Sequence, residues 1–130
     1  MPRQVSIIGA GLVGSLLAVY LARQGHNVRV FERRGDPRAA GYAGGRSINL
    51  ALSARGLWGM AGVGLEQEVL KHAIPMRGRI MHAPTASGDL VFQPYSRNPE
   101  EGINSISRGG LNLALLHAAG REPNVSFSFH

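Results

Sequence analysis

The sequence predicts an α/β fold that begins with a β-α-β unit and later adds an antiparallel hairpin. Two short apolar runs at 5–8 and 28–32 have the residue types of buried strands, and a helical pattern at 12–24 separates them. A helix between two such strands makes them parallel neighbours with a right-handed crossover. The hairpin is predicted by alternating runs at 76–82 and 89–93, which flank a short turn.

The helix at 12–24 is expected to bury one apolar face against the sheet. Large apolar residues recur in it at spacings of three and four, as in an amphipathic helix: Val13, Leu16, Leu17, Tyr20 and Leu21. Gly25 follows directly, at the position where a left-handed glycine commonly ends a helix.

The remaining segments continue the alternation of strands and helices. The residues between 35 and 46 are rich in glycine and are expected to form a loop, and Ser53 is a candidate N-cap. The other predicted elements are a strand at 47–52, helices at 53–61 and 65–73, a strand at 103–107, a helix at 111–119 and a strand at 125–129. In the helix at 111–119, Leu111, Leu115 and Leu116 are expected to face inward.

Composition narrows the classes of function. The 130 residues are enough for one domain, and 44% hydrophobic with 17% charged residues is typical of a globular chain. There is no cysteine, so disulfides, thiol nucleophiles and cysteine-ligated metal sites are excluded, and the histidines show no metal-ligand spacing. The net charge of +6 comes from scattered arginines rather than a basic stripe, which argues against nucleic-acid binding. No apolar run approaches the ~18 residues of a membrane span, and we expect a cytoplasmic protein.

The strongest local motif is Gly9-Ala-Gly11-Leu-Val-Gly14, which stands between the first strand and the first helix. In a dinucleotide-binding turn, the first glycine permits the tight turn, and the second lets the backbone approach a pyrophosphate. The third glycine allows close packing of helix and strand. Glu32 ends the second strand, 18 residues beyond Gly14, where an acidic residue binds the ribose hydroxyls. This context predicts a Rossmann-like nucleotide site.

The negative charge at position 32 limits which dinucleotide the site can bind. A carboxylate there repels a ribose 2′-phosphate, so FAD or NAD is favoured over NADP as the bound dinucleotide. Arg33 and Arg34 stand beside it and would weaken this preference if they faced the nucleotide, although solvated surface arginines are the simpler interpretation. The motif alone leaves FAD and NAD both open.

Longer segments resemble a known family. Residues 9–15 followed by Gly45-Arg-Ser-Ile-Asn-Leu-Ala-Leu-Ser53, together with Ile74-Pro-Met-Arg-Gly-Arg79, resemble the FAD-dependent aromatic hydroxylases and, within them, the kynurenine 3-monooxygenase family. Further matches are Val63–Glu66, Pro94-Tyr95, Ser107-Arg108 and Leu111-Asn112. The resemblance runs from about residue 5 to residue 125.

This resemblance implies FAD as the cofactor, NADPH as a transient reductant and a small aromatic substrate similar to L-kynurenine. Carried over by position, it implies a cofactor-binding set of Gly9, Gly11, Val13, Gly14, Glu32, Arg33, Arg46, Ala51 and Arg108. Arg46 and Ala51 belong to the flavin side of that set, and Arg108 would offset the charge of the pyrophosphate. Arg79 and Tyr95 match positions that bind the substrate carboxylate, although each residue type is by itself common on a sheet surface or in a turn. No catalytic residue and no metal ligand is assigned.

Members of this family are several times longer, and their second FAD motif and substrate domain have no counterpart here. Residues 1–130 are therefore expected to form the N-terminal part of an FAD-binding domain, inactive alone and weak in holding FAD. Two alternatives stay open. One is an NAD-binding module of a dehydrogenase, and the other is a non-catalytic truncated domain that associates with itself through an open sheet edge.

Overall fold

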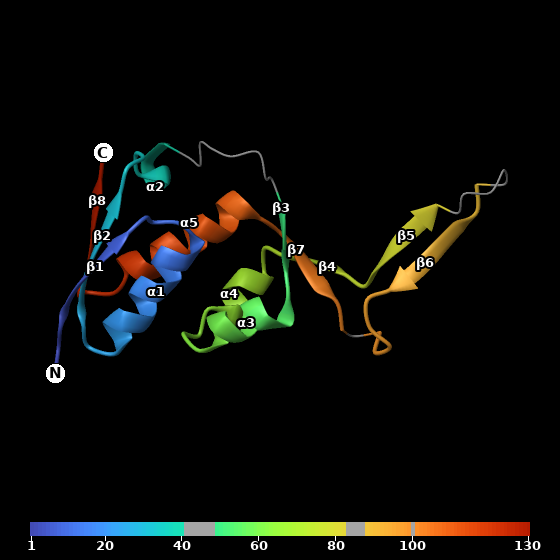
Figure 1. Ribbon diagram of the computed structural model, residues 1–130, viewed down its shortest axis with the longest axis horizontal. Helices are drawn as coiled ribbons and strands as arrows, with labels where there is room; N and C mark the ends of the chain where they lie inside the picture. The colour runs from blue at the N-terminus through green and yellow to red at the C-terminus, as the bar shows by residue number, and fades with distance from the viewer. Residues whose placement is uncertain (41–48, 83–87, 100) are drawn as a thin grey trace.

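The computed structural model describes residues 1–40, 49–82, 88–99 and 101–130. Strand β1 (Gln4–Ile8), helix α1 (Leu12–Arg23) and strand β2 (Asn27–Glu32) form the first unit (Figure 1). The two strands are parallel, and Ile7 lies opposite Val30. The predicted β-α-β beginning is confirmed.

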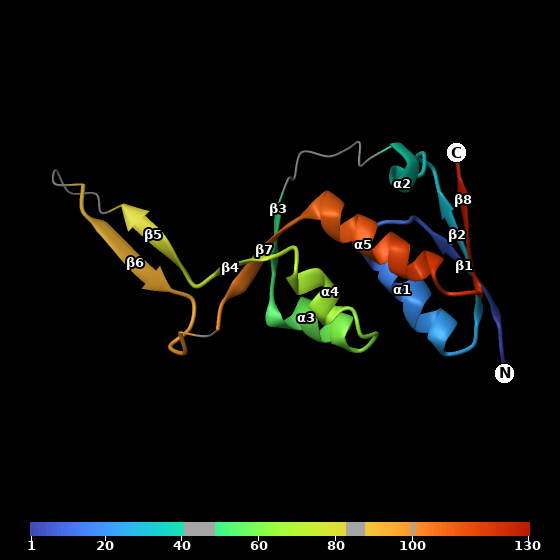
Figure 2. The same cartoon turned by 180° about the vertical axis from the view of Figure 1, so that it is seen from behind.

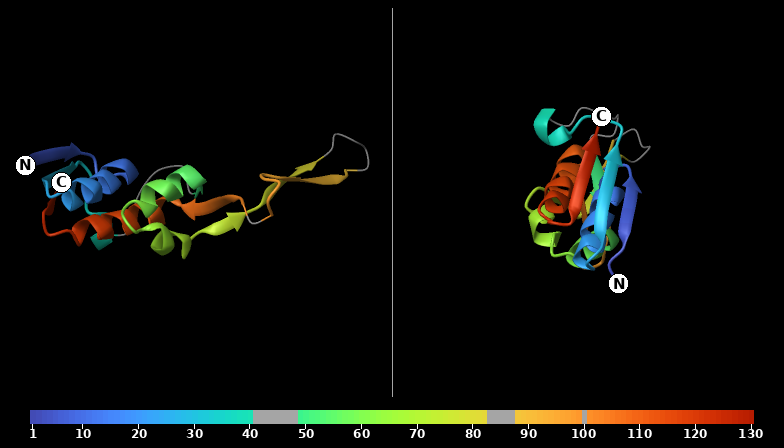
Figure 3. Two further views of the ribbon diagram at one scale, coloured as in Figure 1. Left: turned by 90° about the horizontal axis from the view of Figure 1, so that it is seen from below. Right: turned by 90° about the vertical axis from the view of Figure 1, so that its left-hand side faces the viewer.

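A third parallel strand extends this sheet. β8 (Val125–Phe129) pairs with β2, which gives the order β1-β2-β8. The side chain of Asn124 fixes the start of β8, because its amide nitrogen donates to the carbonyl oxygens of Ala22 (2.8 Å) and His26 (2.6 Å). Within the described residues, β1 and β8 each pair with one strand only. Figure 3 shows the three strands as one layer with the helices on one side of it.

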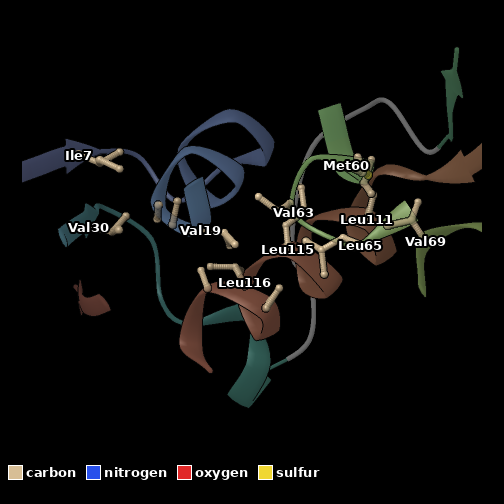
Figure 4. Packing of buried hydrophobic residues seen from close by; sticks show 14 of the residues in the cluster. Ile7, Val19, Val30, Met60, Val63, Leu65, Val69, Leu111, Leu115 and Leu116 are labelled. Carbon is tan, nitrogen blue, oxygen red and sulfur yellow. The ribbon is translucent and has the colours of Figure 1, made fainter. Parts of the chain in front are cut away.

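Helix α5 (Arg108–Gly120) lies beside α1 on the covered face of the sheet. It begins three residues earlier than predicted, because the Ser107 side chain caps it by accepting from the Gly110 N–H (3.3 Å). As predicted, its leucines face the core: Leu115 and Leu116 are 1% and 0% exposed. Figure 4 shows these two leucines packed with Val19 of α1.

The apolar pattern expected on α1 faces the core only in part: Leu16, Tyr20 and Leu21 are partly buried and pack against it. Val13 is 80% exposed and Leu17 is 44% exposed, while the buried positions of this helix are Ser15, Ala18, Val19 and Ala22. Small side chains occupy the buried side because α1 packs against both the sheet and α5, and short side chains allow the helices to approach closely. The predicted glycine cap is present: Gly25 has φ +84° and its N–H donates to Ala22 O.

A second, antiparallel sheet lies beyond the helices. Its order is β3 (Asn49–Leu52), β7 (Ile103–Ser107) and β4 (Ile74–Met76). Helices α3 (Ala54–Ala61) and α4 (Glu66–Leu70) follow β3 along the chain. The predicted helix at 53–61 is confirmed, although the Ser53 side chain makes no capping hydrogen bond, and the one at 65–73 is shorter than predicted.

The α3–α4 segment is tied to α1 by two hydrogen bonds. The Tyr20 hydroxyl donates to the carbonyl oxygen of Gly59 (2.5 Å), and Arg23 donates to the carbonyl oxygen of Val63. A Cβ atom on Gly62 would overlap the Tyr20 hydroxyl, so a larger residue there would displace the Tyr20 side chain. These contacts connect the two sheets through α1.

The predicted hairpin is present as β5 (Gly78–His82) and β6 (Leu90–Pro94), paired antiparallel with Ile80 opposite Phe92. The single strand predicted over 76–82 was wrong, because it divides at Arg77. The part before the division pairs with β7 and the part after it pairs with β6. Figures 1 and 2 show the hairpin extending away from the helices.

One short helix lies in the segment that was expected to be a loop. Pro37–Ala40 forms α2, with the backbone N–H of Arg38 donating to the Asp36 side chain (3.0 Å) at its start. The rest of that segment, with Arg46, lies outside the described residues, as do the first two residues of the strand predicted at 47–52.

Candidate functional site

The turn between β1 and α1 is built around three glycines with different surroundings. Gly9 has φ +100°, a conformation that favours glycine, and its N–H donates to the carbonyl oxygen of Phe31 (2.7 Å). A Cβ atom on Gly14 would overlap the Gly9 carbonyl oxygen, so helix and turn touch there. A Cβ on Gly11 would meet nothing within 4 Å. The backbone at Gly11 is therefore accessible to a ligand, while Gly9 and Gly14 are held in place by close contacts.

The first turn of α1 faces this opening. Gly11 is its N-cap residue and provides no side-chain hydrogen bond, and no acidic residue lies in the first turn. The backbone N–H groups at such a helix start, with the positive end of the helix dipole, favour an anion. Val13 lies beside them with its side chain exposed. This arrangement suits a pyrophosphate chemically.

The Glu32 side chain is hydrogen-bonded to the glycine turn. Its Oε2 accepts a hydrogen bond from the backbone N–H of Ala10 (2.9 Å), and its Oε1 accepts one from the N–H of Arg34 (3.0 Å). Burial raises the pKa of this carboxyl, but the two N–H groups and the charges of Arg34 and Arg33 outweigh that effect and lower it. The side chain is thus an ionised acceptor at the carboxyl end of β2, joined directly to the glycine turn.

Arg33 and Arg34 are both exposed beside this carboxylate. Their charges contribute to keeping Glu32 ionised. Arg33 therefore lies next to Glu32, the residue predicted to accept from the ribose.

Arg108 lies at the first position of α5, exposed, directly after the capping Ser107. Register places Asn49 of β3 opposite Ser107, and Ala51 opposite Ser105. Figures 1 and 2 show α1 and α5 side by side with both N-terminal ends directed toward this second sheet. Ala51 therefore lies on β3, and Arg108 directly follows β7, the strand with which β3 pairs. Arg46 lies outside the described residues.

The two predicted substrate residues lie on the hairpin. The Nε of Arg79 donates to Oε1 of Gln93 (2.7 Å), and both side chains are exposed. The N–H of Tyr95 donates to the carbonyl oxygen of Arg77 (3.0 Å), which continues the β5–β6 register by one step. Strand alternation places Arg79 and Tyr95 on the same face of the hairpin.

Tyr95 also borders an open cavity of about 490 Å³. The cavity lies between the start of α3, β4, β7 and the base of the hairpin, and Arg77, Ser96, Glu101 and Asn104 contribute its polar lining. Arg79 is not among the residues that line it. The structure thus brings Arg79 and Tyr95 to one strand face but not into one pocket.

Two features were missed in the sequence. Asn112 on α5 is 7% exposed, and its side-chain oxygen has no hydrogen-bond partner among the described residues. Asp36 and Arg38 form an ion pair at the start of α2. Asp36 followed by Pro37 is a recognisable helix start, an N-cap residue before proline at the first position, but glycines around it suggested a loop.

Comparisons with known proteins agree with this geometry. A family model described as an NAD(P)-binding Rossmann-like domain matches residues 7–68. Kynurenine 3-monooxygenase of Myxococcus xanthus is 55% identical over 125 residues, which cover 96% of this chain and 26% of that protein. The same enzyme of Salinispora tropica is 53% identical over 127 residues, 97% of this chain and 28% of that protein.

Among solved structures, 2-methyl-3-hydroxypyridine-5-carboxylic acid oxygenase has a TM-score of 0.76 at 20% identity, covering 99% of this chain and 31% of that one. That likeness concerns the fold alone. In the described residues, no helix is long and apolar enough to cross a membrane, and no three His, Asp or Glu side chains gather as metal ligands would.

The chain spans about a quarter of the length of the curated relatives it matches. The resemblance predicted from the motifs is confirmed, and so is the fold class. This chain is a Rossmann-like α/β structure similar, along nearly its whole length, to part of the kynurenine 3-monooxygenases.

Proposed function

We propose that this chain forms the ADP-binding part of an FAD-dependent monooxygenase of the kynurenine 3-monooxygenase kind. One observation carries the proposal: the Glu32 carboxylate bonds the backbone of the glycine turn at Ala10, directly beside the N-terminus of α1. A ribose acceptor and a pyrophosphate site therefore lie next to each other, as the adenosine half of a dinucleotide requires.

The residues present fit FAD by their geometry. The open side of Gly11 leaves room for a pyrophosphate, and Gly14 keeps the helix close enough to present its N–H groups. Gly9, Gly11, Val13 and Gly14 would hold the pyrophosphate, and Glu32 would accept from the ribose, with Arg33 beside it. Arg108 would offset phosphate charge, and Arg46 and Ala51 would serve the flavin side. When bound, FAD would supply hydride acceptance from NADPH and activation of O₂.

The proposed reaction of the whole protein is hydroxylation of L-kynurenine to 3-hydroxykynurenine with NADPH and O₂, as a step of tryptophan degradation and NAD biosynthesis. It is supported by the names of relatives that are 55% and 53% identical to this chain. Arg79 and Tyr95, on one face of the hairpin, are proposed to bind the amino-acid carboxylate, a task that suits a guanidinium and a phenol. A cytoplasmic location belongs to the proposal and rests on the sequence alone.

The first experiment separates a flavoprotein from an NAD module. The 130-residue chain is purified, its visible spectrum is recorded, and FAD, ADP and NAD are titrated into it by calorimetry. The proposal expects FAD and ADP to bind, each more weakly to a Gly11→Ala variant because the methyl group obstructs the pyrophosphate. Tight binding of NAD with no binding of FAD would instead favour the dehydrogenase module.

The second experiment measures whether the 130-residue chain has monooxygenase activity. The chain alone is expected to be inactive, because the substrate domain and the second FAD motif of the family have no counterpart in residues 1–130. Incubation with FAD, NADPH and L-kynurenine should therefore give no 3-hydroxykynurenine by chromatography. Product formation at enzymatic rates would contradict the expectation that residues 1–130 are inactive by themselves.

Self-association is the remaining candidate function, and one observation favours it. Within the described residues, β1 and β8 each have a single partner strand, so each has an edge whose backbone groups face outward. Light scattering over a concentration series tests this candidate. A mass that stays at that of one chain throughout would exclude it.

A further inference from the structure

A compact ionic cluster lies immediately after β2. The Nε of Arg38 donates to both carboxylate oxygens of Asp36 (2.9 and 3.0 Å), and its Nη2 donates to Oδ2 (2.7 Å). The same carboxylate accepts from the backbone N–H of Arg38 (3.0 Å). The side chains are only 25% and 27% exposed. Four hydrogen bonds across two residues hold the start of α2 in one conformation.

The guanidinium of Arg38 also covers two aromatic rings of β8. It lies 4.9 Å from the ring centroid of Phe127 and 5.5 Å from that of Phe129, and the two rings stack on each other. In the parallel register, Phe129 is the partner of Glu32. Because register partners on adjacent strands point to the same face, Arg38 is anchored on the ring beside Glu32.

Helix α5 encloses the same cluster from its C-terminal end. A Cβ atom on Gly120 would lie 2.8 Å from Nη1 of Arg38, so the missing side chain there makes room for the guanidinium. The hydrogen bond from Arg38 lowers the pKa of Asp36, and the charge of His117 on α5 acts in the same direction. Three separate elements, α2, β8 and α5, therefore meet at Arg38.

The link between Glu32 and this cluster is short. Residues 33–35 join them, and Glu32 holds the near end by accepting from the Arg34 N–H (3.0 Å) while it also bonds Ala10. The far end is held by Asp36 and Arg38. A change at the far end can reach the carboxylate along the chain through these three residues, and across the sheet through Phe129, the register partner of Glu32.

We propose that Asp36 and Arg38, here named the Asp36–Arg38 clamp, are positioning residues for the Glu32 carboxylate. The clamp fixes the turn after β2, so that Glu32 presents its oxygens to the ribose 2′-hydroxyl of the nucleotide. Arg38 acts through this turn without touching the nucleotide. The inference rests on the proposed function, since the ligand is the ADP half of the dinucleotide.

The test measures discrimination between two ligands instead of overall affinity. ADP and 2′-deoxy-ADP are titrated into the 130-residue chain by calorimetry. Wild-type protein should prefer ADP by about 10-fold, the worth of a hydrogen bond to a charged acceptor. Arg38→Gln should reduce that preference to about 2-fold, because a misplaced carboxylate no longer meets the hydroxyl. Arg38→Lys should keep more of this preference for ADP than Arg38→Gln does, because lysine keeps the positive charge but lacks the planar guanidinium that bonds both carboxylate oxygens.

Gly120→Ala disturbs the clamp without changing Arg38 or Asp36. The added methyl group displaces only the end of a flexible side chain, and alanine favours a helix over glycine. This variant should keep or raise the thermal midpoint while losing ribose discrimination. Arg121→Gln is the matched control, because it removes the exposed Arg121–Glu68 pair (3.2 Å) between α5 and α4 and should leave discrimination unchanged.

The outcomes separate the two proposals. Wild-type protein that fails to bind ADP overturns both the proposed function and the clamp. Wild-type protein that discriminates, with Arg38→Gln and Gly120→Ala variants that discriminate equally well, overturns the clamp alone. The clamp is also overturned if both ligands weaken by one common factor in these variants. If Arg38→Gln does not fold, Gly120→Ala decides.

Discussion

The nucleotide half and the hairpin of this chain differ in how their functional groups are held. In the sheet covered by α1 and α5, Val30 and Leu116 are 0% exposed, and the backbone of the glycine turn is fixed by contacts with β2. On the hairpin, the facing pair Ile80 and Phe92 is 62% and 59% exposed. One region is covered by its own chain, and the other is not.

This difference determines which functional groups have a fixed position in this structure. Around Glu32, the important groups are backbone N–H donors and one carboxylate, and each has a partner that sets its position. Arg79 and Tyr95 instead extend from two strands that are marginally stable by themselves in water. Their arrangement is held by contacts within the hairpin, whereas the nucleotide turn is held by contacts with the covered sheet.

The largest expected effect comes from a comparison of one truncation in each region. Leu116→Ala should lower the free energy of unfolding by about 3 kcal/mol, because it leaves a cavity in a fully packed core. Phe92→Ala should lower it by less than about 1 kcal/mol, because the ring is largely exposed. Urea denaturation followed by circular dichroism measures both. Equal losses would show that the hairpin contributes as much to stability as the core does.

The next prediction compares two alanine substitutions in the glycine turn, one that should affect stability and one that should affect ADP binding. Gly14→Ala should cost about 2 kcal/mol of stability, because the methyl group overlaps the Gly9 carbonyl and backbone must move. Gly11→Ala should cost about 1 kcal/mol or less, because nothing lies near the new methyl group and alanine is only the poorer N-cap residue, yet it should weaken ADP binding. Thermal denaturation and calorimetry distinguish the two. A destabilised Gly11→Ala protein that binds ADP normally would contradict this division.

The sequence predicted those parts of the fold whose signals are local. Strand β1, the glycine turn and strand β2 follow directly from apolar runs and from glycine spacing. The buried face of α1 followed only in part, because the large apolar residues include the exposed Val13 and Leu17 as well as the partly buried Leu16. Contact with α5 instead favours the small Ala18 and Ala22. Periodicity finds a helix, but the neighbour decides which face it buries.

Features that depend on contacts between residues far apart in the sequence also could not be predicted from it. The alternation over 76–82 is real, but it contains no information that β7 pairs with its first part and β6 with the rest. Likewise, Arg38 meets Phe127 and Phe129 from the far end of the chain. In the candidate site, Glu32 and the glycines were predicted from their spacing, whereas the Asp36–Arg38 clamp depends on contacts between residues far apart in the sequence.

The smallest expected effect concerns acid stability and tests how firmly the clamp belongs to the packed region. Hydrogen bonding from Arg38 lowers the pKa of Asp36, so the unfolded state binds more protons than the native state does. The resulting stability is fully present above the ordinary carboxyl range of about 4 and is lost as pH falls through the lowered value. Asp36→Asn should therefore flatten the decline of unfolding free energy below about pH 4.

The thermodynamic cycle with Arg38 gives this prediction its control. Arg38→Gln should flatten the same decline, because the guanidinium is the main cause of the lowered pKa of Asp36. The double variant should then match either single variant, with a coupling below about 1 kcal/mol for a partly exposed pair. Glu32 also has a lowered pKa and should preserve a residual decline in all three variants. A decline as steep in Asp36→Asn as in wild type would mean that the pair is too mobile to position Glu32, and that α2 behaves like the hairpin rather than like the covered sheet.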